Sequence, residues 1–295
     1  MKVKQREPNN FQEVVTFWQV LRINDIKTGL IMKTNILSIS ALIICMAFGS
    51  CCMGKTVKGN GNIVTREFQI GQFDEIELSL PATVNYSKGD HYGCIVKVDE
   101  NILEYLDICT SESDLELKKA KRYRSVNLHA TKFVIEVVSP TMKGIEIAGS
   151  GDVNVLSGMV GEKMSVEIAG SGDVNFKEPI EFREFDAEIA GSGDVKVMKH
   201  SDLQKFDVEI AGSGDVVLID ANVLYADIEI AGSGDVNLKG VVRKAKVETA
   251  GSGDVVLDEV VERIDYGIVG SGDIYYGGNP TVKGGKAGSG NIRQR

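Results

Sequence analysis

The sequence has few of the residues from which aromatic cores and catalytic sites are usually assembled. It has one tryptophan, Trp18, and only 6% of its 295 residues are aromatic. Its three histidines, His91, His129 and His200, are far apart, and it has no Walker loop, His-Glu-x-x-His or Gly-x-Ser-x-Gly motif. The histidines are therefore expected to be surface or turn residues, and no residue is a candidate for catalysis.

The sequence also lacks an apolar run long enough to span a membrane as a helix. The longest run, from Ile36 to Phe48, has about 13 residues, which is too short for a span. A lysine, Lys33, precedes this run, and small residues follow it, as in an export signal. Residues 32–50 are therefore expected to form a signal peptide.

The cysteines that end this segment resemble the lipobox of bacterial lipoproteins, in which a new N-terminal cysteine receives acyl chains. Cys51 is the expected lipid attachment site. Cys52 is an alternative because Phe48 stands where leucine is more usual, and a plain secretory signal is another. Residues 1–31 are expected to be an incorrectly assigned start that the mature protein lacks, and residues 51–58 a short linker.

The mature chain has an excess of acidic residues. Upstream of Cys51 lie six basic and three acidic residues, which leaves 27 Lys and Arg against 39 Asp and Glu. This balance argues against nucleic acid as a partner, because a phosphate backbone needs a basic footprint. One basic cluster stands out, interpreted as a solvated loop or as a contact for anionic glycan or lipopolysaccharide: Lys118, Lys119, Lys121, Arg122 and Arg124, with Tyr123 among them.

Two of the five cysteines lie beyond the signal and anchor, namely Cys94 and Cys109. The alternation of apolar and polar residues places Cys94 on an apolar strand face and Cys109 on the opposite face from its apolar neighbours. Two free thiols are expected, with a disulfide as the alternative that an export route would permit.

What the sequence has in abundance is one repeated tetrapeptide. Gly-Ser-Gly-Asp occurs seven times from Gly149 to Asp273, and Gly-Ser-Gly-Asn follows at Gly288, with offsets of 21, 21, 21, 20, 19, 19 and 18 residues. A period near 20 indicates one supersecondary unit stacked on itself. The predicted corner residues are Gly149, Gly151, Asp152, Gly170, Gly172, Asp173, Gly191, Gly193, Asp194, Gly212, Gly214, Asp215, Gly232, Gly234, Asp235, Gly251, Gly253, Asp254, Gly270, Gly272 and Asp273.

The residues around each corner alternate between apolar and polar. Before the corner, an apolar–Glu–apolar triplet recurs, as in Val166-Glu167-Ile168. After it come two apolar residues with one residue between them, as in Val174 and Phe176. Period-two alternation predicts strands with one buried face. Glycine allows the positive φ and the close backbone approach that a tight corner between stacked strands requires.

Identical residues at a fixed period predict columns of like side chains. Each coil would pair in parallel with the next, about 4.8 Å away, around a column of Ile and Val that no single coil could bury alone. We therefore predict an all-β fold, a right-handed parallel β-helix, because parallel crossovers strongly prefer that hand. The leucine-rich repeat pattern is absent. Residues 141–295 would form the regular coils and residues 59–140 irregular coils that cap one end, with a separate small β domain as the alternative.

With these features together, residues 60–290 resemble a family of bacterial envelope proteins, the putative auto-transporter adhesin head, GIN domain. The matching features are the lipoprotein-type leader, the segment Phe73-Asp74-Glu75-Ile76, and the stretch from Pro140 to Gly151 that leads into the repeated corners. The resemblance implies a β-helical fold and an extracytoplasmic location. It brings no catalytic residues, and no translocating barrel is visible in the chain.

Stacked coils would bring the corner aspartates into a column, with a column of glutamates beside it. At a spacing of about 4.8 Å, two unit charges repel by roughly 1 kcal/mol in water. We expect this cost to be offset by hydrogen bonds from glycine or serine N–H groups and serine hydroxyls of the corner. Bound calcium is the alternative. Asn62 and Asn291 occupy the corresponding place without charge, so no metal site and no cofactor are expected.

Repeated, equivalent acids favour a structural or multivalent binding role over catalysis, which needs a singular pair of carboxylates. The sequence therefore predicts a non-enzymatic outer-membrane lipoprotein that presents a repetitive acidic surface for adhesion or envelope structure. Its partners would be the membrane, through the lipid anchor, and a glycan or envelope protein. The alternative is a polysaccharide lyase or glycoside hydrolase built on the same fold.

Overall fold

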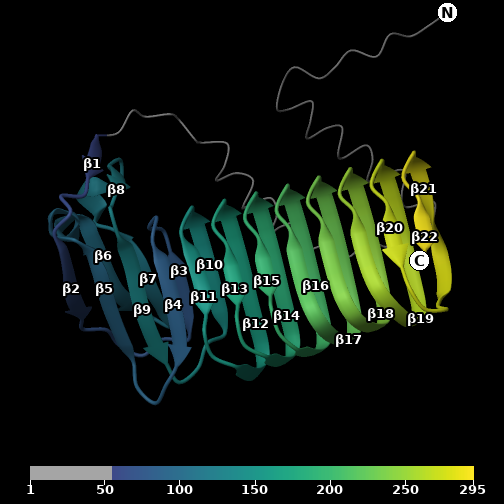
Figure 1. Cartoon of the computed structure of the whole chain (residues 1–295), viewed down its shortest axis with the longest axis horizontal. Coiled ribbons are helices and arrows are strands. Elements are labelled where there is room, and N and C mark those ends of the chain that lie inside the picture. Colours follow the sequence, from purple (N-terminus) through teal and green to yellow (C-terminus); the bar gives the residue numbers. More distant parts are fainter. Residues whose placement is uncertain (1–54) are drawn as a thin grey trace, which may run out of the picture. The chain divides into compact units, whose positions relative to one another are not determined.

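The computed structural model describes residues 55–295, whose buried apolar side chains share one hydrophobic core. The expectations for residues 1–31, for the signal peptide 32–50 and for Cys51 and Cys52 lie outside these residues. The predicted all-β solenoid of parallel coils is confirmed, with coils of about 21 residues and about seven turns. Figure 1 shows the coils side by side along one axis, with the C-terminal strands at one end.

The regular coils consist of two stacks of parallel strands that meet at the Gly-Ser-Gly corners. The strands are β10 (Gly144–Gly149), β11 (Asp152–Val155), β12 (Met159–Gly170), β13 (Val174–Phe176), β14 (Ile180–Gly191), β15 (Val195–Val197), β16 (Ser201–Gly212), β17 (Val216–Gly232), β18 (Val236–Gly251), β19 (Val255–Gly270), β20 (Ile274–Tyr276), β21 (Thr281–Gly288) and β22 (Ile292–Gln294). A short turn, such as residues 177–179, precedes β12, β14 and β16, whereas β17, β18 and β19 run from one corner to the next without a break.

The register places like residues over like, as the period predicted. Ile168 pairs with Ile147 in the preceding coil and with Ile189 in the next, and the same column continues through Ile210 and Ile230. These side chains are at most 3% exposed. At about 25 cal/mol per Å² of apolar area removed from water, such a column supplies the stabilisation that a single thin coil lacks.

The N-terminal part joins the same sheet but differs in strand direction. It contains β2 (Ile63–Phe68), β3 (Glu75–Leu78), β4 (Thr83–Lys88), β5 (Gly93–Asp99), β6 (Leu106–Ser111), β7 (Asp114–Lys119) and β9 (Phe133–Ser139), with the 3₁₀ helices η1 (Glu100–Tyr105) and η2 (Lys121–Tyr123). Strands β3 and β4 continue the parallel coil order beneath β10 and β11. In contrast, β5 is antiparallel to β2 and β9, and β6 is antiparallel to β7.

A two-stranded parallel sheet attaches the start of the described chain to this N-terminal part. Strand β1 (Thr56–Lys58) lies within the segment expected to be a linker and pairs with β8 (Asn127–His129). The Asn127 N–H donates to the Lys55 carbonyl at 3.0 Å, and the Gly59 N–H to the His129 carbonyl at 2.9 Å. In Figure 1, β1 and β8 lie together at the end of the stack remote from β21 and β22.

The last coil breaks the pattern of the core columns. Lys286 takes the place in register of the buried Ile268, and Gly284 that of Tyr266. The Lys286 ammonium donates to the Gly290 carbonyl at 2.8 Å and to Asn291 Oδ1 at 2.7 Å. Lys286 is exposed, and a charged side chain at a sheet edge is a device that stops the edge from pairing with another chain. The C-terminal coil therefore ends the stack with a charged residue where an apolar one would continue the column.

Helix is a minor component of residues 55–295, and no helix there combines the length and the apolar character needed to cross a bilayer.

Cys94 is buried on β5, and burial raises the pKa of its thiol to about 12. Cys109 is a half-buried free thiol whose Sγ lies 3.3 Å from Glu116 Oε2.

Candidate functional site

The corner brings the predicted glycine and aspartate residues into three parallel columns, and the two glycines of each corner serve different needs. Gly191 has a φ of +142°, a conformation that other residues rarely adopt. Gly193 has no such φ, but a Cβ there would lie 2.1 Å from the Gly172 carbonyl oxygen and 2.8 Å from Ile168 Cγ2. The first glycine is required by backbone conformation and crowding, and the second by crowding alone.

The corner aspartates form a hydrogen-bonded chain along the solenoid. Oδ1 of Asp152 accepts the N–H of Asp173, and the same bond repeats between Asp173 and Asp194 and between Asp194 and Asp215, at 2.9–3.1 Å. The series continues through Asp235, Asp254 and Asp273 to the N–H of Asn291. Each carboxylate therefore stabilises the backbone of the following coil.

The donor in this chain differs from the glycine and serine donors that the sequence suggested. Serine N–H groups are already used, because Ser171 donates to the Gly149 carbonyl in the preceding coil at 2.8 Å, and later corners repeat this bond. The aspartate N–H is left without a ladder partner and lies directly beside the preceding carboxylate. A hydrogen bond to a charged acceptor is among the stronger kinds, and it offsets the repulsion between neighbouring carboxylates.

A second set of acids lies on the outward face of the long strands, as the alternation predicted. Eight glutamates pair in register there, which we call the Glu column: Glu116, Glu77, Glu146, Glu167, Glu188, Glu209, Glu229 and Glu248. Burial, together with the charges of Glu188 and Glu229, raises the pKa of Glu209 to about 7. Burial and the Glu167 charge raise the pKa of Glu188 as well.

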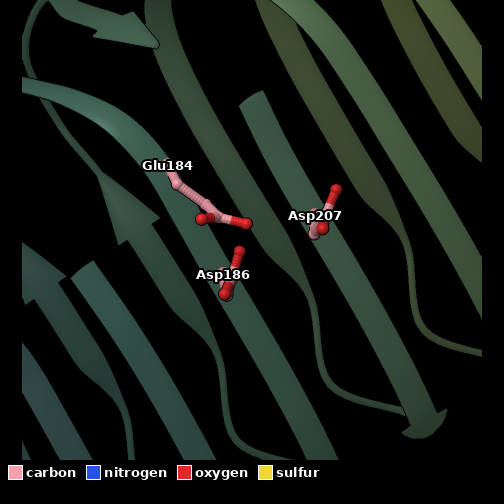
Figure 2. A group of neighbouring side chains, drawn as sticks. All are labelled: Glu184, Asp186 and Asp207. Carbon is pink, nitrogen blue, oxygen red and sulfur yellow. The ribbon is translucent and has the colours of Figure 1, made fainter. Parts of the chain in front are cut away.

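A parallel column of aspartates lies two residues earlier on the same face. Figure 2 shows Glu184 and Asp186 of β14 beside Asp207 of β16. One carboxylate oxygen from each lies within 4.8 Å of the others. Their charges have protein partners, since Lys163 pairs with Asp186 at 2.6 Å, and Lys205 contacts both Glu184, at 3.3 Å, and Asp207. The ion pairs satisfy part of the cluster, while Asp186 Oδ1 and Asp207 Oδ1 are buried without a hydrogen-bond partner among residues 55–295.

Lys246 plays the same neutralising role two coils further on. It occupies the aspartate column and pairs with Asp227 at 3.2 Å, Glu229 at 3.1 Å and Glu248 at 3.3 Å. Burial lowers the pKa of Lys246, but these three carboxylates more than offset it and raise the pKa overall. Near Glu209 no such lysine is in contact, and Glu209 Oε2 is buried without a hydrogen-bond partner among residues 55–295. The middle of the Glu column is thus the least compensated part of this face.

The long strands also form a groove of about 780 Å³ beside the residues that directly precede Glu184 in β14. It crosses β12, β14, β16 and β17, and its polar side chains are Glu162, Glu181, Arg183, Asp202, Gln204 and Asn222. Arg183 lies 3.6 Å from Glu162, and the Asn222 amide donates to Asp202 at 3.0 Å. Sequence reasoning missed this groove, because its residues belong to the variable stretch of the repeat.

His200 lies at the border of this groove and contacts two acids. Its ring nitrogens lie 3.1 Å from Asp202 and 3.1 Å from Asp220. Hydrogen bonds to Asp202 and Asp220 raise its pKa. The ring is about half exposed, so the histidine is a surface residue, with an acidic environment that sequence spacing did not reveal. His91 is also exposed, beside Asp90, and His129 is exposed on β8.

The basic cluster occupies the turn between β7 and β8. Lys121, Arg122 and Arg124 are exposed, whereas Lys118 pairs with Glu116. The Lys119 ammonium donates to the carbonyls of Arg124 and Val126, both at 3.0 Å, and so fixes the turn. The cluster is therefore a rigid projection at the N-terminal end, remote from the groove.

The comparisons with known proteins agree with this architecture. The chain belongs to the family described as "Putative auto-transporter adhesin, head GIN domain", whose model matches residues 72–258. This confirms the resemblance that the corner motif and the Phe-Asp-Glu-Ile segment indicated. A comparison with curated proteins gives no match.

Several solved bacterial structures share the fold. A "putative lipid binding protein" from Parabacteroides distasonis is 29% identical, with a TM-score of 0.73, covering 82% of this chain and 100% of its own. A "putative adhesin" from Parabacteroides merdae is 22% identical, with a TM-score of 0.75, covering 82% and 99%. A "putative adhesin" from Parabacteroides distasonis is 23% identical, with a TM-score of 0.74, covering 82% and 100%. Proteins with this fold are thus described as adhesins or binding proteins.

Proposed function

We propose that the protein is an exported, lipid-anchored binding protein of the bacterial envelope that acts without catalysis, as an adhesin or a structural component. The observation that carries the proposal is the equivalence of the coils. Each coil from β10 to β18 offers a glutamate at the same place in register. A repeated surface can engage several groups of one ligand at once, and avidity then exceeds the affinity of any single contact.

The adhesin family and the solved relatives support this proposal. The anchor would be Cys51, or Cys52, at the end of an export signal, and the location would be the outer membrane. We expect the ligand to be a glycan or an envelope protein with basic or hydroxyl-rich groups, since the exposed sheet face is dominated by carboxylates. Nucleic acid does not suit such a face.

Binding can be tested with the chain from residue 53, applied to a glycan array and to extracted envelope proteins. A variant with Glu188→Gln, Glu209→Gln and Glu229→Gln should lose most of its binding. The matched control has Glu67→Gln, Glu178→Gln and Glu259→Gln, three exposed glutamates outside the Glu column, and should bind as the parent does. Equal binding by both variants would remove the Glu column from the interaction surface. Protease treatment of intact cells would show whether the chain faces outward.

A second candidate is an enzyme that acts on polysaccharide, and one observation favours it. Glu162, Glu181 and Asp202 gather in the groove, and glycosidases use a pair of carboxylates on either side of the bond they cleave. Release of reducing ends from envelope polysaccharides, abolished by Glu181→Gln or Asp202→Asn, would establish this function. If the parent chain releases none, the groove serves binding alone.

A further inference from the structure

The basic residues of the N-terminal end come from two segments that are distant in sequence. Residues 55–58 and 118–132 together contain eight basic and no acidic residues, in a mature chain with 27 basic and 39 acidic. The parallel pairing of β1 with β8 places the two segments side by side. Fewer than one residue in twelve of the mature chain thus carries nearly a third of its positive charge.

Six of the eight side chains are exposed, and we call them the basic end: Lys55, Lys58, Lys121, Arg122, Arg124 and Lys132. None of the six forms an ion pair with any residue in the range 55–295. The two others are used within the fold, because Lys118 pairs with Glu116 and Lys119 donates to backbone carbonyls. The positive charge of the basic end is therefore available to a partner.

The turn between β7 and β8, which carries Lys121, Arg122 and Arg124 of the basic end, packs on η1. The Tyr123 ring packs on the Tyr105 ring of η1 at 4.4 Å between centroids, and the Arg122 guanidinium lies 4.7 Å above Tyr123. Three acids lie near the turn, and one of them, Glu104, is exposed and hydrogen-bonds to Tyr105. Glu116 contacts Lys118, and Asp107 stands opposite Lys118 in register. The charges thus project from a rigid support, which lowers the entropy cost of binding.

The place of the basic end in the chain indicates its partner. Four residues separate Cys51 from the start of β1 at Thr56. Because an extended residue spans at most about 3.6 Å, an acylated Cys51 would lie within about 18 Å of β1. We propose that the basic end binds the anionic headgroups of the membrane that holds the anchor, so that the solenoid stands away from the bilayer. This inference rests on the proposed lipid anchor.

The charge of the rest of the molecule favours the same orientation. The Glu column begins at Glu116 on β7, which pairs with Lys118, and continues through β3 and β10 to β18, so most of its members lie further along the solenoid than the basic end. An anionic surface attracts lysine and arginine close to it and repels carboxylates within a Debye length. Lying flat would bring the Glu column toward the headgroups, whereas standing on the basic end keeps it in solvent. A polybasic patch is one of the signals that can add to lipidation in stable membrane anchoring.

The test uses the chain from residue 53, which has no anchor and therefore reports on the basic end alone. Residues 55–295 have their own core, and solved relatives consist of the matching unit without further chain. In sedimentation assays the protein should bind vesicles of phosphatidylcholine with 30% phosphatidylglycerol, and not pure phosphatidylcholine. Binding should fall steeply between 50 mM and 500 mM salt.

A charge variant and a matched control distinguish the effect of where the removed charges lie from the effect of net charge. Lys121→Ser, Arg122→Ser and Arg124→Ser together should weaken vesicle binding by about 100-fold, at about fivefold for each charge removed. Lys177→Ser, Lys199→Ser and Lys239→Ser remove three exposed lysines from the solenoid and should leave binding within about threefold of the parent. Circular dichroism melts would verify that both variants fold.

Three outcomes would overturn the inference. These are equal binding to both vesicle types, equal losses in the two triple variants, and capture of a soluble polyanion such as dextran sulfate without binding to anionic vesicles. The last would assign the basic end to an anionic glycan. Because the assayed chain has no anchor, failure here is distinct from failure of lipid attachment, which is judged on Cys51 in cells.

Discussion

Oδ1 of Asp173 accepts the backbone N–H of Asp194, one coil further on, at 3.0 Å. The side chain of one coil thus completes the backbone hydrogen bonding of the next, at the place where the corner interrupts the ladder. The same relationship holds at each of the seven aspartates of the corner column. The repeated aspartate is therefore first of all a structural element of coil-to-coil pairing.

The first prediction concerns this bond. Asp173→Ala should destabilise the protein by about 1 to 3 kcal/mol, because the Asp194 N–H would lose its acceptor in a partly buried place. Asp173→Asn keeps an oxygen acceptor and should cost less than half as much, consistent with Asn291 at the corresponding position in the last coil. Urea unfolding measures both. If alanine and asparagine cost the same, the carboxylate acts through its charge.

The second prediction concerns the second glycine of a corner. Gly193→Ala should cost about 3 kcal/mol or more, because the new Cβ would lie 2.1 Å from the Gly172 carbonyl oxygen in the rigid preceding coil. Gly285→Ala is the matched control, since nothing lies within 4 Å of its Cβ position. Thermal melts of the two variants should differ by several degrees. Similar melting temperatures would mean that adjacent coils separate easily.

Most of the solenoid could be predicted from the sequence, because the same packing positions recur in every repeat. Once Ile168, Ile189 and Ile210 are aligned, alternation fixes their face and the period fixes their neighbours. Residues 59–140 contain no such repetition, so the antiparallel order of β5 between β2 and β9 had no signal. Pairing of β1 with β8 depends on contacts between segments about 70 residues apart, which local patterns do not encode.

The candidate surfaces were predicted less completely than the fold. The Glu column is visible in the repeat, but the donor to each corner aspartate depends on which N–H groups the ladder has already used. The groove arises beside Glu162 and Arg183, where the pairing of β12 with β14 skips one residue. Their identities vary from coil to coil, so only the folded structure shows that they lie together. The place of Lys286 in the column of Ile268 could have been found by extending the register one coil further.

The third prediction concerns pH. Glu209 has a pKa of about 7 in the folded protein, raised by burial and by neighbouring acids above the ordinary value of 4.5. The folded state therefore holds this proton more tightly than the unfolded state, and stability should rise as pH falls from 8 to about 5. Glu209→Gln should be more stable than the parent at pH 8, and this difference should shrink toward pH 5.

Melting temperatures of the parent and Glu209→Gln at pH 8, 7, 6 and 5 provide the measurement. Glu178→Gln removes the same charge from an exposed turn outside the Glu column and serves as the control. A stability difference between Glu209→Gln and the parent that does not change with pH would show that Glu209 is ionised equally in both states.

The fourth prediction concerns the C-terminal end of the stack. Lys286→Ile restores an apolar residue in the column of Ile268 and removes the charge that opposes edge pairing. We expect concentration-dependent association of this variant, detected by light scattering after size-exclusion chromatography. Lys283→Ile, at the outward position paired with Asp265 in register, adds the same apolar surface and should stay at the size of the parent. Association of both variants would show that any added apolar surface causes it, whatever its position.

The lipid anchor connects the solenoid to the proposed envelope function, and its direct measurement is the intact mass of the protein purified from membranes. We predict a mature chain that begins at Cys51 and carries acyl chains on that residue, with a Cys51→Ala chain left unprocessed and without acyl chains. A mature chain without acyl groups, recovered from the soluble fraction, would contradict the account.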